Sequence, residues 1–283
     1  MRLRILCWLM LAGFGVQAQD FTWWNQVHNW DGFTPWNQYM TYSHAYFGPN
    51  ALPIPSFENS DRNFIRMSTQ NSLRTDDVFN TLHTDLLWRR GKTQFHVTFY
   101  ALEHYSTTTE VRDLRAARVE SGSGTEVGDV LLNVSTEVWR NDARAIHFTA
   151  HLKTAAGHLP GARFTDAPGY AFFFTGIQDW KNGNWSGYLQ TDMGFQVYQT
   201  FWADYPQNDG FQGNFKAVAQ HGAWELCGEF KSYTGYFRNG DWPRIGTVAL
   251  GYSTQNQNYS LGLTHGFNDY PFTFATVGMR TFF

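Results

Sequence analysis

Serine, histidine and acidic residues, the types from which hydrolytic sites are built, lie near the middle of the sequence and before it. Ser135 has the chemistry of a nucleophile, His147 or His151 that of a general base, and Asp85 or Glu137 that of the acid that orients the base. No glycine-rich nucleophile turn accompanies Ser135. Neighbouring strands often bring such types together by chance, so these residues are candidates for lipid or acyl-ester hydrolysis without an accompanying motif.

Histidine is a common metal ligand, so the spacing of the histidines along a strand decides whether two of them can bind one ion. His147 and His151 are four residues apart, which in a strand separates their Cα atoms by about 13 Å and prevents them from chelating one metal ion. His83 and Asp85 are two apart, about 6 to 7 Å, and share one face, so their side chains can interact. No ligand spacing singles out a metal site; a histidine site built across strands is the weaker alternative to a wet polar network, and nothing in the sequence indicates a cofactor.

The elements that carry these residues alternate with period two, as strands do and helices do not. Val130, Leu132 and Val134 share one face of such a segment, whereas Asn133 and Ser135 share the other. Twelve strands are predicted on this pattern, at 62–73, 78–89, 93–105, 128–140, 145–155, 167–179, 184–199, 209–220, 223–234, 243–254, 257–267 and 272–283. The predicted fold class is therefore all-β.

The connections alternate in length. Tight turns are predicted at 90–92, 141–144, 181–183, 221–222 and 255–256, and longer loops at 106–127, 156–166, 200–208 and 235–242. Such alternation is typical of a transmembrane antiparallel up-and-down β-barrel. Aromatic residues near strand ends, as in interfacial girdles, favour this fold over a soluble β-sandwich or barrel: Trp88, Tyr105, Trp139 and Trp202.

The two chain ends support export and membrane insertion. Arg2 and Arg4 precede an apolar run, and small residues end it at Ala18, which predicts a signal peptide over 1–18. At the other end, Ala275 to Phe283 alternate toward a terminal phenylalanine. This ending resembles that of Gram-negative outer-membrane β-barrels of the porin-like, terminal-Phe type. The resemblance implies a bacterial outer-membrane location, contact with lipid, and recognition of the last strand, ending at Phe283, by the barrel assembly machinery.

Composition agrees with a barrel and argues against a nucleic-acid partner. Aromatic residues make up 18% of the chain and charged residues only 16%. Loss of the predicted signal peptide removes two arginines, which leaves 19 basic against 24 acidic residues. A nucleic-acid-binding protein would be expected to carry a basic patch, so this negative balance predicts none.

Residues 19–61 do not follow the strand pattern. They are rich in aromatic residues and contain three prolines within seven positions, which exclude regular structure there. We expect this segment to fold into the barrel as a plug or to pack at its periplasmic mouth; an additional strand near 37–47 followed by a linker is the alternative. The candidate plug residues are Trp23, Trp24, Trp30, Trp36, Pro49, Pro53 and Pro55.

The barrel, residues 62–283, would enclose polar side chains of both charge signs. The residues predicted to line the lumen are His83, Asp85, His96, Tyr100, Asn133, Glu137, His147, His151, Lys153, Asp192, Lys216, Glu225, Glu229 and Arg280. Opposed charges in a narrow lumen orient and select passing solutes. The expected function is a channel for small polar solutes, with sugars or nucleosides as candidates. A plugged, non-conducting barrel that docks an envelope protein partner is the alternative, and the hydrolase above is a second one.

Overall fold

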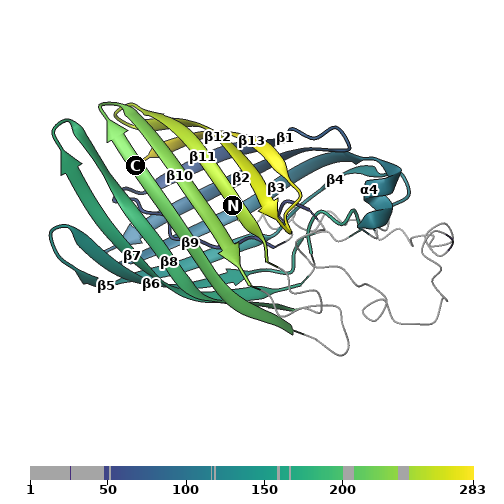
Figure 1. The fold of residues 1–283 in the computed structure, drawn as a ribbon, viewed down its shortest axis with the longest axis horizontal. Coiled ribbons are helices and arrows are strands. Elements are labelled where there is room, and N and C mark those ends of the chain that lie inside the picture. Colours follow the sequence, from purple (N-terminus) through teal and green to yellow (C-terminus); the bar gives the residue numbers. More distant parts are fainter. Residues whose placement is uncertain are drawn as a thin grey trace, which may run out of the picture.

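The fold is a closed antiparallel β-barrel of twelve strands, as predicted (Figure 1). A computed structural model describes Gln26 and residues 48–50, 52–115, 117, 119–157, 160–165, 167–199, 207–234 and 242–283. The predicted signal peptide over 1–18, the alternative strand near 37–47, and Trp23, Trp24, Trp30, Trp36 and Trp202 lie outside these residues. In the described part of the chain, no helix is long and apolar enough to cross a membrane.

All predicted strands are present, with ends that shift by a few residues. The barrel strands are β1 (Phe64–Ser72), β2 (Asp77–Arg90), β3 (Thr93–Thr107), β5 (Val130–Arg140), β6 (Arg144–Lys153), β7 (Gly169–Asn182), β8 (Trp185–Gln199), β9 (Gln207–His221), β10 (Trp224–Tyr233), β11 (Arg244–Ser253), β12 (Gln257–Asn268) and β13 (Thr273–Phe282). The barrel closes because β1 pairs with both β2 and β13. The short strand β4 (Ser123–Glu126) extends the end of β3, and helix α4 (Thr109–Leu114) precedes it.

The two faces of the barrel differ in polarity, because alternate side chains of a strand point to opposite sides. On β5, Val134 and Val138 are exposed on the outer face, whereas Ser135 between them is buried inside. On β13, Val277 and Met279 face outward, as the alternation toward Phe283 predicts. An apolar exterior around a polar interior is the arrangement that a lipid bilayer requires of a barrel.

The two ends of the barrel differ in their connections, and we name them accordingly. The turn end carries the tight turns and the C-terminus; Gly91 and Gly222 adopt positive φ values of 62° and 60° there, which favour glycine. The loop end carries the longer connections, including α4 and β4 (Figure 1). The five predicted tight turns thus lie at the turn end and the four predicted long loops at the loop end, which also holds two short connections, 73–76 and 269–272.

One aromatic position differs from its prediction. Tyr105 was expected near an outer girdle, but it points inward and is 2% exposed. The cause is a bulge in β3 at Ala101, between the pairs Leu82 with Leu102 and His83 with Tyr100. One additional residue moves every later side chain of a strand to the opposite face. Trp88, on the regular strand β2, is exposed on the outer face. Trp139 is exposed there as well, because a bulge in β5 between Glu137 and Trp139 moves it from the inner face that Ser135 and Glu137 share.

The described residues before β1, 48–50 and 52–63, run through the barrel interior, and we call them the inner segment. At the loop end, the hydroxyl of Tyr270 donates to the carbonyl oxygen of Pro49 at 2.8 Å. At the turn end, Arg62 Nη1 donates to the carbonyl oxygen of Gln255, also at 2.8 Å. The inner segment therefore reaches both ends of the lumen before the chain enters β1.

Candidate functional site

The inner segment is held to the β8–β9 wall by polar side chains that bind its backbone. The Phe57 N–H donates to Asp192 Oδ2 at 3.1 Å, and Gln190 Nε2 donates to the Phe57 carbonyl at 2.9 Å. Asn214 Nδ2 donates to the Pro55 carbonyl at 2.7 Å. These side chains provide the hydrogen bonds to backbone groups that a neighbouring strand would provide in a sheet.

The prolines explain why the wall supplies amide groups at these positions. Pro53 and Pro55 have no N–H and hold their backbone extended, so the segment cannot join the sheet as a regular strand. Its carbonyl oxygens still need donors, because a buried carbonyl without a partner is costly. Asparagine and glutamine side chains carry two N–H donors each and reach inward from alternate strand positions.

Apolar side chains of the inner segment fill the lumen on the same side. Leu52 and Ile54 belong to a buried cluster with Tyr198 and Tyr233. Phe57 is 3% exposed and its ring stacks on His147, with centroids 4.4 Å apart. This side of the lumen is therefore closed by packed side chains.

Charged residues of β1, β2 and β13 face the inner segment. Together with Glu58 of that segment, Arg66, Asp85 and Arg280 form what we call the mid-lumen network. Arg280 Nη2 lies 2.7 Å from Glu58 Oε1, and Arg66 Nη1 lies 3.5 Å from Glu58 Oε2. Arg66 Nε also binds Asp85 Oδ2 at 2.8 Å. These side chains retain some exposure, 13% for Glu58 and 23% for Arg66, so the network borders open space.

Asp85 organises the polar side of the lumen. Its Oδ1 accepts a hydrogen bond from Thr98 Oγ1 at 2.6 Å and lies 3.2 Å from His96 Nε2, while His83 Nε2 is 3.9 Å from Oδ2. The predicted coupling of His83 and Asp85 is thus a loose contact, and the firm partners of Asp85 are Arg66, Thr98 and His96. Asp85 fixes the orientation of Arg66.

A second ionic cluster, which we call the loop-end network, is completely buried. Arg163 is 0% exposed; its Nε lies 2.5 Å from Glu103 Oε1 and its Nη1 lies 2.8 Å from Asp77 Oδ1. Arg115 Nη2 reaches the other oxygen of Asp77 at 2.5 Å. Burial by itself would lower the pKa of Arg163, but the Glu103 and Asp77 carboxylates raise that pKa above its ordinary value. This network ties the 160–165 loop to the strands at the loop end.

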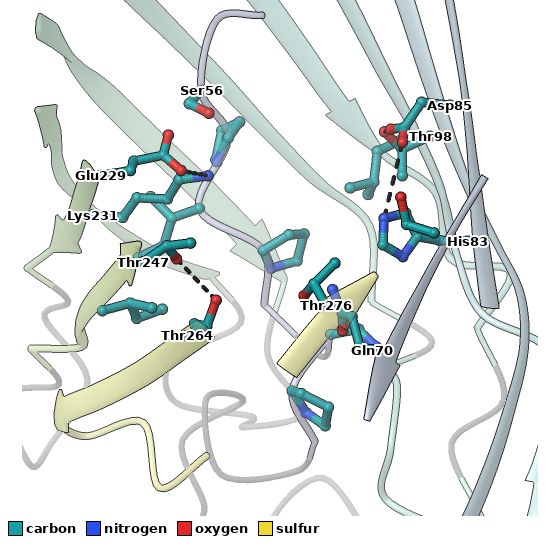
Figure 2. A pocket seen from close by; sticks show the side chains of 18 of the residues that line it. Ser56, Gln70, His83, Asp85, Thr98, Glu229, Lys231, Thr247, Thr264 and Thr276 are labelled. Carbon is teal, nitrogen blue, oxygen red and sulfur yellow. Dashed lines mark hydrogen bonds and ion pairs between the residues drawn. The ribbon is translucent and has the colours of Figure 1, made fainter. Parts of the chain in front are cut away.

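Between the inner segment and a wall formed by β1–β3, β5, β6 and β9–β13 lies a cavity of about 350 Å³. Figure 2 shows Glu229 and Lys231 on one side of the inner segment and Asp85, Thr98 and His83 on the other. The cavity lies within the range of small-molecule sites, about 300 to 1,000 Å³, and its walls carry charges of both signs. It is therefore our candidate site.

The predicted lumen residues divide into two groups. Those that line the cavity are His83, Asp85, His96, Tyr100, Asn133, His151, Lys216 and Glu229, and Pro49, Pro53 and Pro55 line it from the inner segment. The other predicted residues do not line it. Lys153 is buried and binds Asp129 at 2.7 Å, Asp192 and His147 lie beneath the inner segment, and Glu137 pairs with Arg140 at 2.5 Å. Glu225 binds Gln220, and Arg280 contacts Glu58 beside the cavity.

The catalytic candidates are not brought together. Ser135 lies opposite Thr149 on β6, and their hydroxyl oxygens are 2.8 Å apart. His147 lies opposite Glu137 instead, and Asp85 is engaged by Arg66. Among the described residues, no group of three or more His, Cys, Asp or Glu side chains is arranged to hold a metal ion.

Several site residues were missed by sequence reasoning. Glu58 was not distinguished from its neighbours because the segment that carries it has no period-two pattern. The partners Glu103 and Arg163 lie in a bulged strand and a loop, where parity gives no prediction. A charged residue in an otherwise apolar, proline-rich stretch was the available signal for Glu58.

Comparison with known proteins identifies the fold and no family. No family model matches the chain, and no curated protein matches its sequence. A solved outer membrane channel from Pseudomonas putida F1 superimposes with a TM-score of 0.51 at 12% identity, over 83% of this chain and 97% of that one. The KdgM porin gives 0.49, and its complex with disordered oligogalacturonate 0.46; each is 12% identical and covers 78% of this chain and 99% and 98% of theirs. The fold is thus that of a transmembrane β-barrel of the bacterial outer membrane, as predicted.

Proposed function

We propose that this protein is an outer-membrane channel for small polar solutes, with the inner segment as a plug that fills part of its lumen. The observation that carries the proposal is the polar cavity of about 350 Å³ beside that segment. A barrel filled only for stability would be expected to pack its interior with side chains. Here the β8–β9 side is packed, whereas the opposite side is open and polar.

The chemistry of the cavity favours solutes with several hydroxyl or charged groups. Thr98, Thr247 and Thr276 supply hydroxyl groups, and Lys216 and Glu229 supply opposite charges. Tyr100 and Tyr270 add aromatic rings, on which the apolar faces of sugars or nucleosides stack. This arrangement supports passage of small sugars or nucleosides and does not favour large apolar compounds.

The orientation in the membrane follows from the connections. Short turns face the periplasm and long loops face the exterior in such barrels, so the turn end is periplasmic. The outward-facing residues of the strands contact lipid, and the last strand, ending at Phe283, is the segment that the barrel assembly machinery recognises. The inner segment then enters the lumen from the external side and leaves it at the periplasmic side.

A permanently plugged barrel that docks an envelope protein is a second candidate. The observation that favours it is the set of contacts that the inner segment makes at both ends, to Tyr270 at the loop end and to Gln255 at the turn end. A segment fixed along its whole length would seal the lumen. A channel conducts ions across a bilayer, whereas a permanently plugged barrel does not.

Conductance in planar bilayers separates them. We expect the intact protein to give single-channel steps, and a variant that lacks residues 19–58 to give larger steps because the cavity then widens. The matched control is Asn141→Ala, in a tight turn outside the lumen. Silence of the intact protein with conductance of the truncated one would favour the plugged barrel, and silence of both would overturn the channel.

A further inference from the structure

Two arginines face each other directly across neighbouring strands of the lumen wall. Arg66 on β1 is paired in register with Arg280 on β13, and both side chains point inward. Like charges directly opposite each other destabilise a sheet. The pair therefore requires an anion between the two guanidinium groups.

The inner segment supplies that anion. Each oxygen of the Glu58 carboxylate lies near a different arginine, Oε1 at 2.7 Å from Arg280 and Oε2 at 3.5 Å from Arg66. The wall thus holds a carboxylate between two arginines on adjacent strands, although the carboxylate itself belongs to a segment outside the sheet. Two donors that reach both oxygens of one carboxylate form a geometrically specific site.

The two arginines are held in place without Glu58. Phe64, which is 0% exposed, lies beneath both guanidinium groups, with the Arg280 Cζ atom 4.3 Å and the Arg66 Cζ atom 5.7 Å from its ring centre. Asp85 anchors Arg66 from β2. Departure of Glu58 would leave a formed site and not a collapsed one, because an aromatic platform and an ion pair remain.

The site opens toward the cavity and carries an excess of positive charge. Glu58 and Arg66 both line the cavity, and so does Lys216. Of the strand residues that line it, three are cations, Arg66, Lys216 and Lys231, and two are anions, Asp85 and Glu229. Arg280, beside the cavity, adds a fourth cation. A solute carboxylate that entered the cavity could bind the same two arginines, Arg66 and Arg280, that Glu58 binds.

We infer that the Arg66–Arg280 pair is a binding site for solute carboxylates, and that Glu58 occupies it as an internal substitute. The inference rests on the proposed channel function and narrows its solutes to carboxylate-bearing polar molecules, such as sugar acids. Solute and Glu58 compete for one site, so solute binding releases the inner segment from this wall.

Binding of D-glucuronate, with D-glucose as the uncharged partner of the same size, tests the inference. Equilibrium dialysis with radiolabelled ligands would compare the full-length protein with Glu58→Ala and with Glu58→Ala combined with Arg280→Gln. We expect Glu58→Ala to bind glucuronate about tenfold more tightly than the unaltered protein, because the internal competitor is gone. The double variant should lose this gain, and glucose binding should not change.

Controls separate a binding effect from a folding defect. Each variant is first tested for the change in electrophoretic mobility on heating that a folded barrel shows, and Glu58→Gln replaces Glu58→Ala if the latter does not fold. Glu225→Gln is the matched control, because Glu225 binds Gln220 and not an arginine. Equal glucuronate affinity of Glu58→Ala and the unaltered protein, or an equal gain for glucose, would overturn the inference.

Conductance of the same proteins keeps the two proposals apart. Absence of conductance together with tighter glucuronate binding by Glu58→Ala would contradict the channel and support the carboxylate site. Conductance without any preference for glucuronate in any variant would support the channel and contradict the carboxylate site.

Discussion

The two ionic networks of this barrel contain the same chemical groups but have different surroundings. In the loop-end network, Arg163, Glu103 and Asp77 are 0% exposed and none of the three lines the cavity. In the mid-lumen network, the side chains of Glu58 and Arg280 are 13% and 19% exposed and lie beside the cavity. An ion pair without access to water is fixed, whereas a pair beside open space can exchange its partner.

This difference assigns separate roles to the two regions. The loop-end network joins β2, β3 and the 160–165 loop, so its loss should unfold that end of the barrel. The mid-lumen network joins the wall to the inner segment, so its loss should change what the lumen binds and passes. Stability and selectivity are therefore expected to respond to different arginines.

The largest expected effect comes from Arg163→Met. Removal of Arg163 leaves the Glu103 carboxylate buried without its counter-charge and Asp77 with Arg115 alone, which costs about 3 to 5 kcal/mol. Urea unfolding in lipid vesicles, followed by tryptophan fluorescence, measures the free energy of unfolding. Arg163→Lys, which keeps the charge, should lose less; equal losses for the two variants would contradict a role for the charge.

A smaller loss of stability but a clear change in permeation is expected from Arg280→Gln. The Glu58 pair that it breaks is partly solvated, so the loss should be about 1 to 2 kcal/mol. The lumen also loses one cation, and the reversal potential in a KCl gradient should move toward cation selectivity. An unchanged reversal potential would contradict a position of Arg280 in the conducting path. Arg163→Lys serves as the control, because Arg163 does not line the cavity.

The inner segment itself is tested by Asn214→Ala. This substitution removes the hydrogen bond to the Pro55 carbonyl, at a cost of about 1 kcal/mol. We expect more frequent opening transitions in single-channel records, because the segment is held less firmly on the β8–β9 wall. The control is Ser135→Ala. The Ser135 hydroxyl points inward but binds Thr149 and not the segment, so this variant should open as often as the unaltered protein.

The smallest effect is expected at the exposed pair Arg74–Asp76, in the short connection between β1 and β2. The hydrogen bond from Arg74 lowers the pKa of Asp76, and partial burial opposes this shift without reversing it. A lowered pKa contributes stability that is present above the ordinary aspartate pKa and lost as the pH falls through the folded-state pKa. Asp76→Asn should therefore cost less than about 1 kcal/mol, and the cost should be constant from pH 5 to 8. A loss that varied within this range would contradict the assignment.

Sequence reasoning located the strands because their pattern is local. Val134 and Ser135 face opposite sides of β5 for a reason that neighbouring residues already specify, since successive side chains of a strand alternate. The face of Tyr105 could not be predicted in this way, because it is reversed by a bulge that depends on the pairing of β2 with β3. Parity is predictable only as far as a strand stays regular.

The partners of charged residues were beyond sequence reasoning. Arg66 and Arg280 stand at opposite ends of the barrel sequence and meet only because β13 closes against β1. Glu58 reaches them because the inner segment passes between the walls. Lys153 was expected to line the lumen, yet the fold buries it against Asp129. Contacts of this kind depend on the register of closure and on loop packing.

Alternation and turn chemistry act over a few residues, so a twelve-stranded barrel with a polar interior, an apolar exterior and tight turns at one end can be predicted from the amino-acid sequence alone. Which side of the lumen is packed and which is open depends on the folded chain. The same holds for the arginines, of which one pair is sealed among buried carboxylates while another lies beside a cavity. An ionic group takes its role from its partners and its access to water, and both depend on chain segments that meet only when the barrel closes.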